Sequence, residues 1–551
     1  MMRHGLLLFL AFFLLYMVGA DRYDLFTDDE IRYAEAGRQM LVQGDWLVPR
    51  YNGRTRYQKP ILYYWTQAVS QGLFGSTPWA ARLPSALAGA GVVWLTWHLG
   101  CLTAGLQVGT WAAVLLGLSA QMFLISRMAL TDMVLLLFLQ GSFVCFLHAR
   151  LTSESGCRAS WFRAMYGCMA LGLLTKGPIA IILPALVLLP WLWRRGELRS
   201  TWRHGSPYCG GLILLAIAGP WYLLVTAMTG GDFLHHFLWH ENWGRFTEVV
   251  NKHHQPGLFY LLLLVPLAFP WLGFLPSSLR LAWRCPAQGA MRQSLPSLWL
   301  WNVCVVLGLF TLSRTKVWTY ILPLGPALAL LMASWLHRLQ ERRQRPPTIQ
   351  TGAFAVFAVV TLAVAVIVQR HDLGFIPEPF AHGPLFQALK GSCWLLTGVA
   401  WLVWIVQRRR SVSAAVSTLC GGVVLWYLSI IYLVLPHVDE VWRAPVRQVA
   451  SWVRAHPEAI LFTVQIHELG LNFHADQERV YHRRLGCASE LRMHLCGPKP
   501  VFILISAEHA DYLEGLPFQV WCRWPGVVFG GNRPPPGTRA VVSTWLAVGP
   551  F

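Results

Sequence analysis

The chain has 551 residues, of which 55% are hydrophobic and 13% are charged, and its mean hydropathy is +0.44. A soluble globular protein carries about 25% charged residues, so this composition excludes an ordinary soluble fold and favours a membrane protein. The net charge of +19 does not indicate a nucleic-acid partner, because the basic residues form short clusters between apolar runs and not one stripe or tail.

The predicted membrane spans begin with the apolar run at residues 5–20, which follows Arg3 and His4. A signal peptide has the same basic start, but many further apolar runs follow, and we interpret this run as an uncleaved first helix. A helix crosses the hydrocarbon core with about 20 apolar residues. Fourteen runs approach that length: 5–20, 61–75, 84–102, 108–126, 131–149, 160–175, 178–193, 208–228, 258–281, 296–313, 318–337, 352–369, 388–407 and 412–435.

Basic clusters indicate which of these runs cross the membrane. Arginines gather in five alternate loops, at 150–163, 194–203, 280–292, 338–345 and 408–410, which the positive-inside rule assigns to the cytoplasm. This assignment agrees with a cytoplasmic Arg3 only if the run 61–75 does not cross. That run is short and is interrupted by Thr66, Gln67, Ser70 and Gln71. We therefore predict thirteen spans, a cytoplasmic N-terminus, an outer C-terminus and an amphipathic helix at 61–75 on the outer surface.

The first outer segment, 21–83, collects charges in an otherwise apolar chain. Four acids, Asp28, Asp29, Glu30 and Glu35, are interleaved there with Arg32 and Arg38. Helical spacing would allow them to pair with one another, so a charged surface helix is the simplest explanation.

Three outer turns between later spans also carry charges. Asp132 could serve a helix N-terminus, and Lys176, before Gly177 and Pro178, could extend its ammonium to the interface. Arg314 and Lys316 oppose the positive-inside trend, and a bound anion would explain them. Because ionisable residues are costly at membrane depth, we treat all of these turns as candidate functional sites.

The segment 235–257 is rich in histidine, with His235, His236, His240, His253 and His254. Histidine and carboxylate groups bind zinc, but this spacing matches no closed structural zinc site. A solvated interfacial loop is the favoured explanation of this composition.

Together, the outer segments supply cations that could hold a phosphate and carboxylates that could remove a proton from an acceptor. A transporter would instead need charges or broken helices near the bilayer midplane. The charges here gather at the rim, which favours an interfacial enzyme.

From about residue 436 the composition changes to that of a small α/β domain on the outer side. Strands are expected at 461–466, 500–508 and 538–548. Cys487, Cys496 and Cys522 could include one disulfide in an oxidising compartment, although their spacing does not decide the pairing.

The run TDDEIRYAEAGRQMLVQGDWLVPRYNGRTRYQKPILYYW resembles the first periplasmic loop of bacterial lipid A aminoarabinose transferases. These are polytopic GT-C glycosyltransferases related to protein O-mannosyltransferases. Further matches are LTKG (174–177), WHENWGRF (239–246), PWLGFLP (270–276) and TKVWTYILP (315–323), so the resemblance covers roughly residues 1–340. It implies a GT-C membrane domain at 1–435 and a periplasmic α/β domain at 436–551, in a bacterial inner membrane.

The resemblance implies a polyprenyl-phosphate sugar as donor and a lipid A-like or other envelope lipid or glycan as acceptor, among membrane lipids. Asp29 falls on the family's essential carboxylate, and Asp132 is a second family acid. Four residues fall on positions around the donor phosphate: Lys59, Lys176, Arg245 and Tyr320. Arg32 and Tyr33 fill the remaining motif positions near the site.

Two residues depart from the family pattern. Gln58 replaces the glutamate of the EKP motif, and Asn242 replaces a histidine; in the aminoarabinose transferases both positions are zinc ligands. A neutral amide binds zinc poorly, so we predict no such metal in this chain, with His240 and Glu241 as weak candidates for a rearranged site. The departures also leave the sugar and the acceptor open.

Three alternatives remain at this point. The chain could be a flippase for a lipid-linked sugar, a protein O-glycosyltransferase, or an inactive scaffold. A flippase would move the donor without cleaving the bond between sugar and phosphate. Intact Asp29, Asp132 and Lys59 argue against a scaffold.

Overall fold

The computed structural model describes most of the chain. The residues it describes are 2–51, 54–248, 255–285, 290–341, 348–370, 383–409, 412–456, 459–464, 473–474, 480–482, 495–496, 500–506, 513, 515–524 and 527–532. Every structural statement below concerns these residues.

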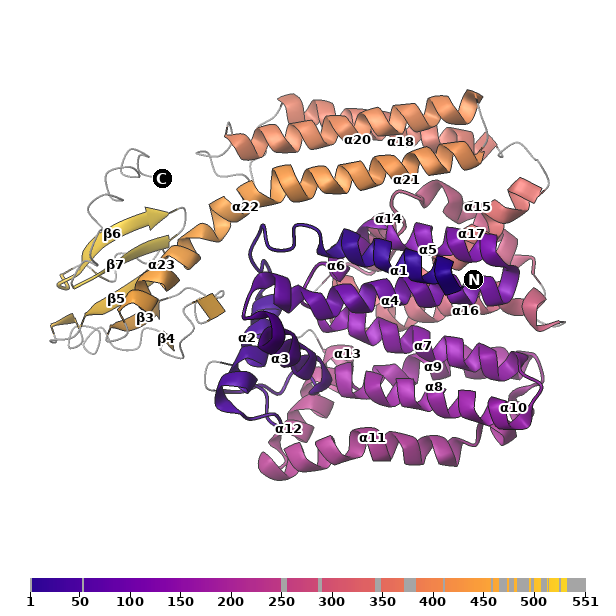
Figure 1. Cartoon of the computed structure of the whole chain (residues 1–551), viewed down its shortest axis with the longest axis horizontal. Coiled ribbons are helices and arrows are strands. Elements are labelled where there is room, and N and C mark those ends of the chain that lie inside the picture. Colours follow the sequence, from indigo (N-terminus) through magenta and orange to yellow (C-terminus); the bar gives the residue numbers. More distant parts are fainter. Residues whose placement is uncertain are drawn as a thin grey trace.

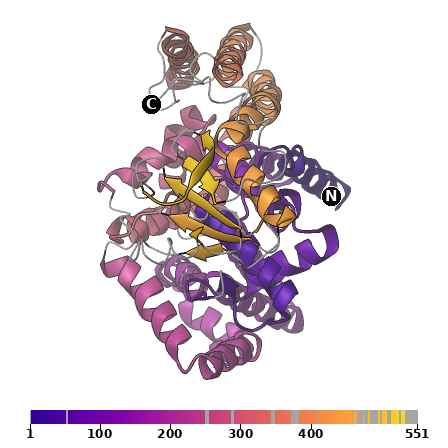
Figure 2. The same ribbon diagram turned by 90° about the vertical axis from the view of Figure 1, so that its left-hand side faces the viewer.

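The chain folds into a bundle of long helices with a small sheet domain beyond one end (Figure 1). The bundle consists of α1 (Met2–Met17), α4 (Pro78–Ala104), α5 (Leu106–Gly117), α6 (Ala120–Ser126), α7 (Thr131–Leu151), α8 (Ser155–Lys176), α9 (Ile179–Arg194), α11 (Pro207–Met228), α14 (Phe259–Ala268), α15 (Leu275–Trp283), α16 (Met291–Leu312), α17 (Leu324–Glu341), α18 (Thr348–Arg370), α20 (Pro384–Arg409) and α21 (Val412–Ser429). Helices α18, α20 and α21 form a layer along one side of the bundle, as Figure 2 shows from the sheet-domain end.

Each of the thirteen predicted spans coincides with one helix or with one bent pair of helices. Among the described residues, seven helices are long and apolar enough to cross a membrane, and two pairs, α5–α6 and α14–α15, qualify if each pair is one bent span. Three shorter apolar helices lie in α1, α9 and α18. Helix α8 corresponds to the thirteenth predicted span. It is less apolar than the others because its first half carries Arg158 and Arg163.

Short elements gather at the end of the bundle that faces the sheet domain. They are α2 (Asp28–Gln43), the hairpin β1 (Arg50–Tyr51) and β2 (Arg54–Thr55), α3 (Leu62–Phe74), α12 (Asp232–His235), the π-helix η1 (His236–Gly244), α13 (Arg245–Thr247) and the 3-10 helix η3 (Trp318–Ile321). Figure 1 shows α2, α3 and α12 together at this end, whereas the amphipathic α10 (Leu198–Gly205) and the N-terminus lie at the opposite end.

Helix α3 explains why the run 61–75 contains polar residues. Its polar side chains are buried: the Gln67 and Ser70 side chains donate to the carbonyls of Ala81 and Ala80, and Gln71 donates to that of Ala34. The exposed face is apolar, with Leu73 72% exposed. A helix of 13 residues with this arrangement is too short to span the bilayer and suits its interface.

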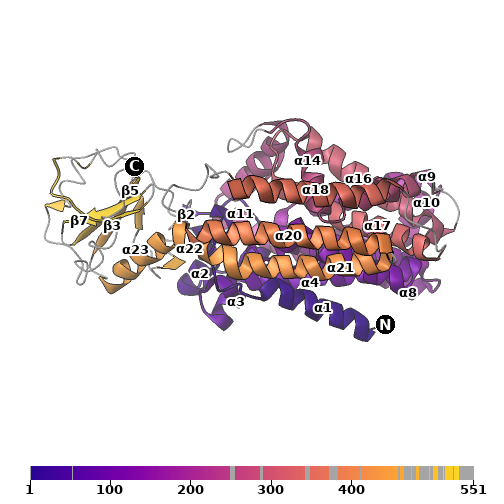
Figure 3. The ribbon, with the colours of Figure 1, turned by 90° about the horizontal axis from the view of Figure 1, so that it is seen from above.

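The sheet domain contains a five-stranded mixed sheet in the order β4-β3-β5-β7-β6. Its elements are α23 (Ala444–Ala455), β3 (Ile460–Val464), β4 (Val480–His482), β5 (Val501–Ser506), β6 (Gln519–Trp524) and β7 (Val527–Gly531). Because side chains alternate along a strand, Phe502 and Leu504 of β5 pack with α23 on one face, while Ile503 and Ile505 pack on the other. Helix α22 (Leu435–Trp442) links this domain to the bundle (Figure 3).

Two sequence predictions in this domain correspond to β3 and β5, and the third, at 538–548, lies outside the described residues. Cys496 and Cys522 are free thiols, so no disulfide joins these two. Cys487 lies outside the described residues.

A buried ion pair attaches the first outer segment to the bundle. Glu30 closes a capping box with Thr27 at the start of α2, and its Oε1 accepts a hydrogen bond from the Ala129 amide at 2.9 Å. The Arg82 guanidinium of α4 lies 3.5 Å from the same oxygen and donates to the carbonyls of Ala20, Tyr23 and Asp24. Both charged side chains are about 1% exposed.

We expect Arg82→Met to lower the free energy of unfolding by about 3–5 kcal/mol, because the substitution leaves a buried carboxylate without its cation. The apparent unfolding temperature of the detergent-solubilised protein would report the loss. Arg32→Met is the control, because its exposed pairs with Asp28 and Asp29 contribute about 0–1 kcal/mol. Equal effects of the two substitutions would contradict the anchoring role of Arg82.

Candidate functional site

The ends of α7 and α8 bring Asp132 and Lys176 together. Asp132 lies in the first turn of α7, and α8 ends at Lys176 because Gly177 has a φ of +91°, a conformation that glycine adopts without strain. A Cβ atom at residue 177 would lie 2.5 Å from the Phe237 ring, so glycine also allows η1 to approach. Lys176 Nζ donates to Asp132 Oδ1 at 2.7 Å.

A second cluster centres on Glu241 of the π-helix η1. Its Oε2 lies 3.3 Å from Lys59 Nζ and 2.8 Å from Arg245 Nη2. Arg245 Nη1 lies 3.3 Å from the Tyr320 hydroxyl, and Lys176 Nζ lies 5.3 Å from the centre of the Tyr320 ring. The two clusters therefore join into one group of charges that draws on five separate parts of the chain.

The charges of this group act on one another. Burial raises the pKa of the Glu241 carboxyl, but Lys59 and Arg245 outweigh burial and bring that pKa below its ordinary value. Burial, with the positive charges of Arg245 and Lys176, lowers the pKa of the Lys59 ammonium to about 8 against the opposing effect of Glu241 and Asp29. Cations thus exceed anions in this buried group, which favours an added anion.

A cavity of about 620 Å³ adjoins these charges. Its polar wall includes Lys59, Asp132, Lys176, Glu241, Arg245 and Tyr320, and its apolar wall includes Leu135, Leu139, Ile182, Leu183, Leu309 and Phe310. Leu139 lies seven residues along α7 from Asp132, so the apolar part reaches about 10 Å into the bundle. The cavity can hold a negatively charged group that carries a long apolar chain.

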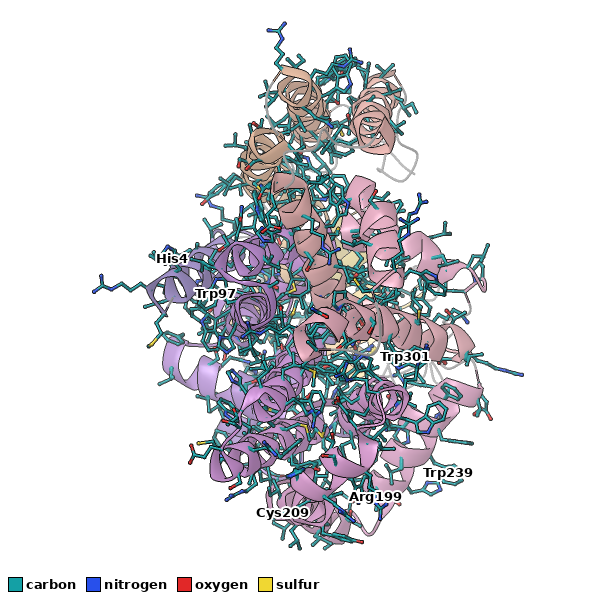
Figure 4. All side chains as sticks on the ribbon, turned by 90° about the vertical axis from the view of Figure 1, so that its right-hand side faces the viewer. His4, Trp97, Arg199, Cys209, Trp239 and Trp301 are labelled. Carbon is teal, nitrogen blue, oxygen red and sulfur yellow. The ribbon has the colours of Figure 1, made fainter. Side chains whose placement is uncertain are left out.

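Aromatic side chains of η1 and α13 border the cavity on the outer side. Trp239, Trp243 and Phe246 line it and are also exposed, Trp239 by 66%. Figure 4 shows Trp239 projecting beyond the helices at the edge of the bundle. Indole rings with an apolar body and one polar nitrogen suit the membrane interface.

The four acids of α2 have different surroundings. Glu30 and Glu35 are buried and bonded, Glu35 to Arg38 at 2.8 Å, and Asp28 pairs with Arg32 at 3.2 Å. Asp29 is 60% exposed, lies 3.9 Å from Arg32, and acts on the Lys59 charge. Asp29 does not line the cavity, but it is the most exposed of these four acids and its charge acts on Lys59, which does line it.

Arg32 and Tyr33 do not line the cavity. Arg32 contacts the two exposed acids of its own helix. Tyr33 is buried between Tyr63 and Tyr64, with the Arg56 guanidinium 5.0 Å from its ring centre. Arg56, which the sequence did not single out, donates to the Tyr64 hydroxyl at 2.7 Å and supports the hairpin that precedes Lys59.

Arg314 and Lys316 also lie outside the residues that line the cavity. The Lys316 ammonium is buried and donates to the Ser313 carbonyl at 2.9 Å, while the Arg314 amide donates to the Phe246 carbonyl. The bond of Arg314 ties the loop before η3 to α13. The sequence suggested that Arg314 and Lys316 bind an anion. Lys59, Lys176 and Arg245 are better placed to bind it, because they line the cavity.

Sequence reasoning treated Glu241 only as a weak metal candidate and missed its place between two cations. The spacing to Arg245 is a helical i, i+4 pair, which could have been recognised. Lys59 is 182 residues away, and no local pattern links it to Glu241.

The residues present do not fit the zinc ion that the family resemblance implies. The Asn242 amide nitrogen donates to the Phe237 carbonyl at 2.7 Å, and Glu241 is already bonded to two cations. The His240 ring lies near that of His236, with ring centres 5.0 Å apart and the ring planes tilted by 49°. In the part of the chain that the structure describes, no three side chains of His, Cys, Asp or Glu are grouped to hold an ion.

Comparisons with known proteins agree on one family. A family model described as dolichyl-phosphate-mannose-protein mannosyltransferase matches residues 2–234. The chain is 30% identical over 418 residues to an undecaprenyl phosphate-alpha-4-amino-4-deoxy-L-arabinose arabinosyl transferase of Aeromonas hydrophila, covering 75% of this chain and 74% of the relative. A protein with the same description from Yersinia enterocolitica is 31% identical over 380 residues, covering 69% and 67%.

Two solved structures share the fold of this chain. The crystal structure of ArnT from Cupriavidus metallidurans bound to undecaprenyl phosphate matches with a TM-score of 0.83 at 23% identity, covering 96% of this chain and 98% of that chain. The apo structure of the same protein matches with a TM-score of 0.81. The predicted fold, a polytopic GT-C bundle with a small C-terminal domain, is confirmed.

We expect the affinity of the cavity for undecaprenyl phosphate to fall as the pH rises through about 8, because Lys59 is charged below its pKa of about 8 and neutral above it. The phosphate monoester stays dianionic over this range, since its second pKa is about 6. Above pH 8 the dissociation constant should rise by up to about tenfold per pH unit.

Lys59→Arg provides the control for this pH dependence, because arginine stays charged. Its titration in detergent between pH 6.5 and 9.5 should give a nearly constant dissociation constant. A constant value for the unsubstituted protein would contradict the role of the Lys59 charge.

We expect the protein purified without chelators to contain well below one zinc ion per chain, because amides stand at Gln58 and Asn242. Elemental analysis would measure the content, and a chelator should leave the apparent unfolding temperature unchanged. The double variant Gln58→Glu with Asn242→His, which restores the two family ligands, should gain zinc. One tightly held zinc ion in the unsubstituted protein would contradict this prediction.

Proposed function

The chain belongs to the undecaprenyl phosphate-aminoarabinose arabinosyl transferase family of GT-C glycosyltransferases, and from this membership we propose that it moves a sugar from a polyprenyl phosphate to an acceptor on the outer side of the membrane. The protein is a multi-pass membrane glycosyltransferase. The inner membrane of a bacterium, with the C-terminal domain in the periplasm, is the location that fits this activity and the predicted topology.

One observation carries the proposal: three cations, with the carboxylates of Asp132 and Glu241 beside them, line a cavity whose other lining residues are mostly apolar. A phosphate satisfies the cations, and a polyprenyl chain fits the apolar part that follows α7 and α9. A water-soluble sugar phosphate would leave the apolar wall unfilled. The cavity therefore favours a lipid-linked donor, and the undecaprenyl phosphate bound to the solved relative from Cupriavidus metallidurans supports the same choice.

The proposed reaction is a direct displacement at the anomeric carbon. The acceptor oxygen forms a bond to that carbon, and the bond from the carbon to the phosphate oxygen breaks. The electron pair leaves with the polyprenyl phosphate, and Lys59, Lys176 and Arg245 stabilise the charge that develops there. Asp132 holds the Lys176 ammonium in position at 2.7 Å.

Asp29 would take the proton of an acceptor hydroxyl, because it is the exposed acid next to the cavity cations. If the acceptor is a phosphate of a lipid A-like glycolipid, that group is already ionised at neutral pH, and Asp29 would orient it. The relatives' names suggest aminoarabinose as the sugar and thus a lipid A-like acceptor. The residues around the cations specify neither the sugar nor the acceptor.

We expect Asp29→Asn to lower the turnover of sugar transfer by about 10²–10⁴-fold where the acceptor oxygen is a hydroxyl, the usual contribution of a general base, and by a smaller factor where it is an ionised phosphate. Purified protein would be incubated with labelled undecaprenyl-phosphate aminoarabinose and lipid A, and cleavage of the bond between sugar and phosphate would be followed. Asp28→Asn is the matched control, because Asp28 is bonded to Arg32, and should retain turnover within about threefold.

The same assay separates the transferase from a flippase. Transfer at the rate of the unsubstituted protein by Asp29→Asn would refute the role of Asp29. Movement of the donor across liposomes without cleavage of the bond would refute the transferase function itself.

A further inference from the structure

The loop between α1 and α2 holds a buried carboxylate that the proposed reaction does not use. Asp24 is 3% exposed, and its Oδ2 lies 2.6 Å from His474 Nε2 and 3.5 Å from Arg447 Nη1. Its Oδ1 accepts the Leu25 amide at 2.7 Å. Burial raises the pKa of the Asp24 carboxyl, but the hydrogen bond and charge of His474, with Leu25 and Arg447, outweigh burial and lower it. His474 and Arg447, both from the C-terminal part of the chain, thus help to keep Asp24 ionised.

Further bonds join the same loop to α22 and α23. The Asp24 amide donates to Asp439 Oδ1 at 2.7 Å, and Asp439 forms two bonds with Arg447, at 2.9 and 2.5 Å. Arg443 donates to the Phe26 carbonyl. The loop that leads into α2 is therefore bonded on one side to Arg82 of α4 and on the other to the C-terminal part of the chain.

Phe473, next to His474, belongs to a buried apolar cluster that includes residues beside the two candidate acids. It is 3% exposed and forms one apolar cluster with five side chains of the membrane domain, namely Leu25, Ile31, Ala34, Ala81 and Ala129. Leu25 and Ile31 flank the first turn of α2, where Asp29 lies, and Ala129 precedes α7, where Asp132 lies. One side chain from the sheet-domain region thus shares a buried apolar cluster with residues next to both acids.

From these contacts we propose that the C-terminal domain is a positioning element of the active site, in which Phe473 and His474 hold the start of α2, with Asp29, against the start of α7, with Asp132. The inference rests on the proposed function, because it assigns the two acids their roles. Neither Phe473 nor His474 touches the cavity, so both act through α2 and the loop before α7.

The physical reason lies in the position of Asp29 at a helix N-terminus. Asp29 is 60% exposed, and its 3.9 Å contact with Arg32 lies within its own helix, so its placement depends on the placement of α2. A displacement of about 1 Å at a reacting group can lower a rate by about 10²-fold. Removal of Phe473 would take the apolar contact from one side of α2, while Glu30 and Arg82 would still hold the other.

The test uses the full-length protein and four substitutions. Phe473→Ala removes the apolar contact, and Phe473→Leu keeps most of it; His474→Ala removes the bond to Asp24, and His474→Gln keeps a donor. Phe518→Ala and His456→Ala are matched controls, because Phe518 packs within the sheet domain and His456 bonds to Trp452 of its own helix. Transfer kinetics would be measured with labelled undecaprenyl-phosphate aminoarabinose, together with the dissociation constant for undecaprenyl phosphate.

We expect Phe473→Ala to lower kcat by at least about tenfold while the dissociation constant for undecaprenyl phosphate changes by less than about twofold, because the cavity is untouched. His474→Ala should likewise lower kcat and leave the dissociation constant nearly unchanged. Phe473→Leu and His474→Gln should retain most of the kcat of the unsubstituted protein. The inference is overturned if Phe473→Ala keeps its kcat, or if Phe518→Ala lowers kcat equally with the same split.

A second measurement does not depend on the reaction. Hydrogen–deuterium exchange of Phe473→Ala should rise in residues 24–34 and 127–131, and Phe518→Ala should leave both segments unchanged. Unchanged exchange in both segments overturns the inference even if the unsubstituted protein transfers sugar. Absence of transfer by the unsubstituted protein, with raised exchange in Phe473→Ala, refutes the proposed function and leaves the positioning of α2 intact.

Discussion

The free-energy cost of burying charged side chains away from water determines how the outer elements of this protein are arranged. Glu30 and Arg82 are paired in the interior because each buried charge would be costly without its partner. Arg82 also donates hydrogen bonds to three carbonyls of the loop before α2. This pair sets the position of α2, and α2 in turn buries the polar face of α3 through Gln71 and Ala34. The bonds of Gln67 and Ser70 to carbonyls of α4 attach α3 to the bundle as well.

Burial of charge is also costly at the candidate site, where the cations outnumber the carboxylates by one. Lys176 is matched by Asp132, but Glu241 is shared between Lys59 and Arg245. Within a partly buried group, the excess positive charge is costly until an anion arrives. A phosphate on an apolar chain relieves this excess and fills the cavity that follows α7 and α9. In the proposed function, this arrangement would bind the leaving group before any chemistry begins.

Much of the fold could be predicted because its causes are local. Length and apolarity define the spans, and the arginine loops define their direction, so the parity of the charges was enough to identify α3 as a surface helix. The cluster around Glu241 could not be predicted, because Lys59 and Glu241 are 182 residues apart. The same holds for Phe473, whose partners lie in α2, in α4 and before α7.

The sequence by itself determined the membrane class, the alternation of the loops, the family and the absence of two zinc ligands at Gln58 and Asn242. Each of these depends on composition or on residue types at short spacing, which need no knowledge of packing. Only the tertiary structure decided which acid of DDEIRYAE is exposed beside the cations. Glu30 and Glu35 became structural and Asp29 stayed accessible because burial depends on the neighbours that folding supplies.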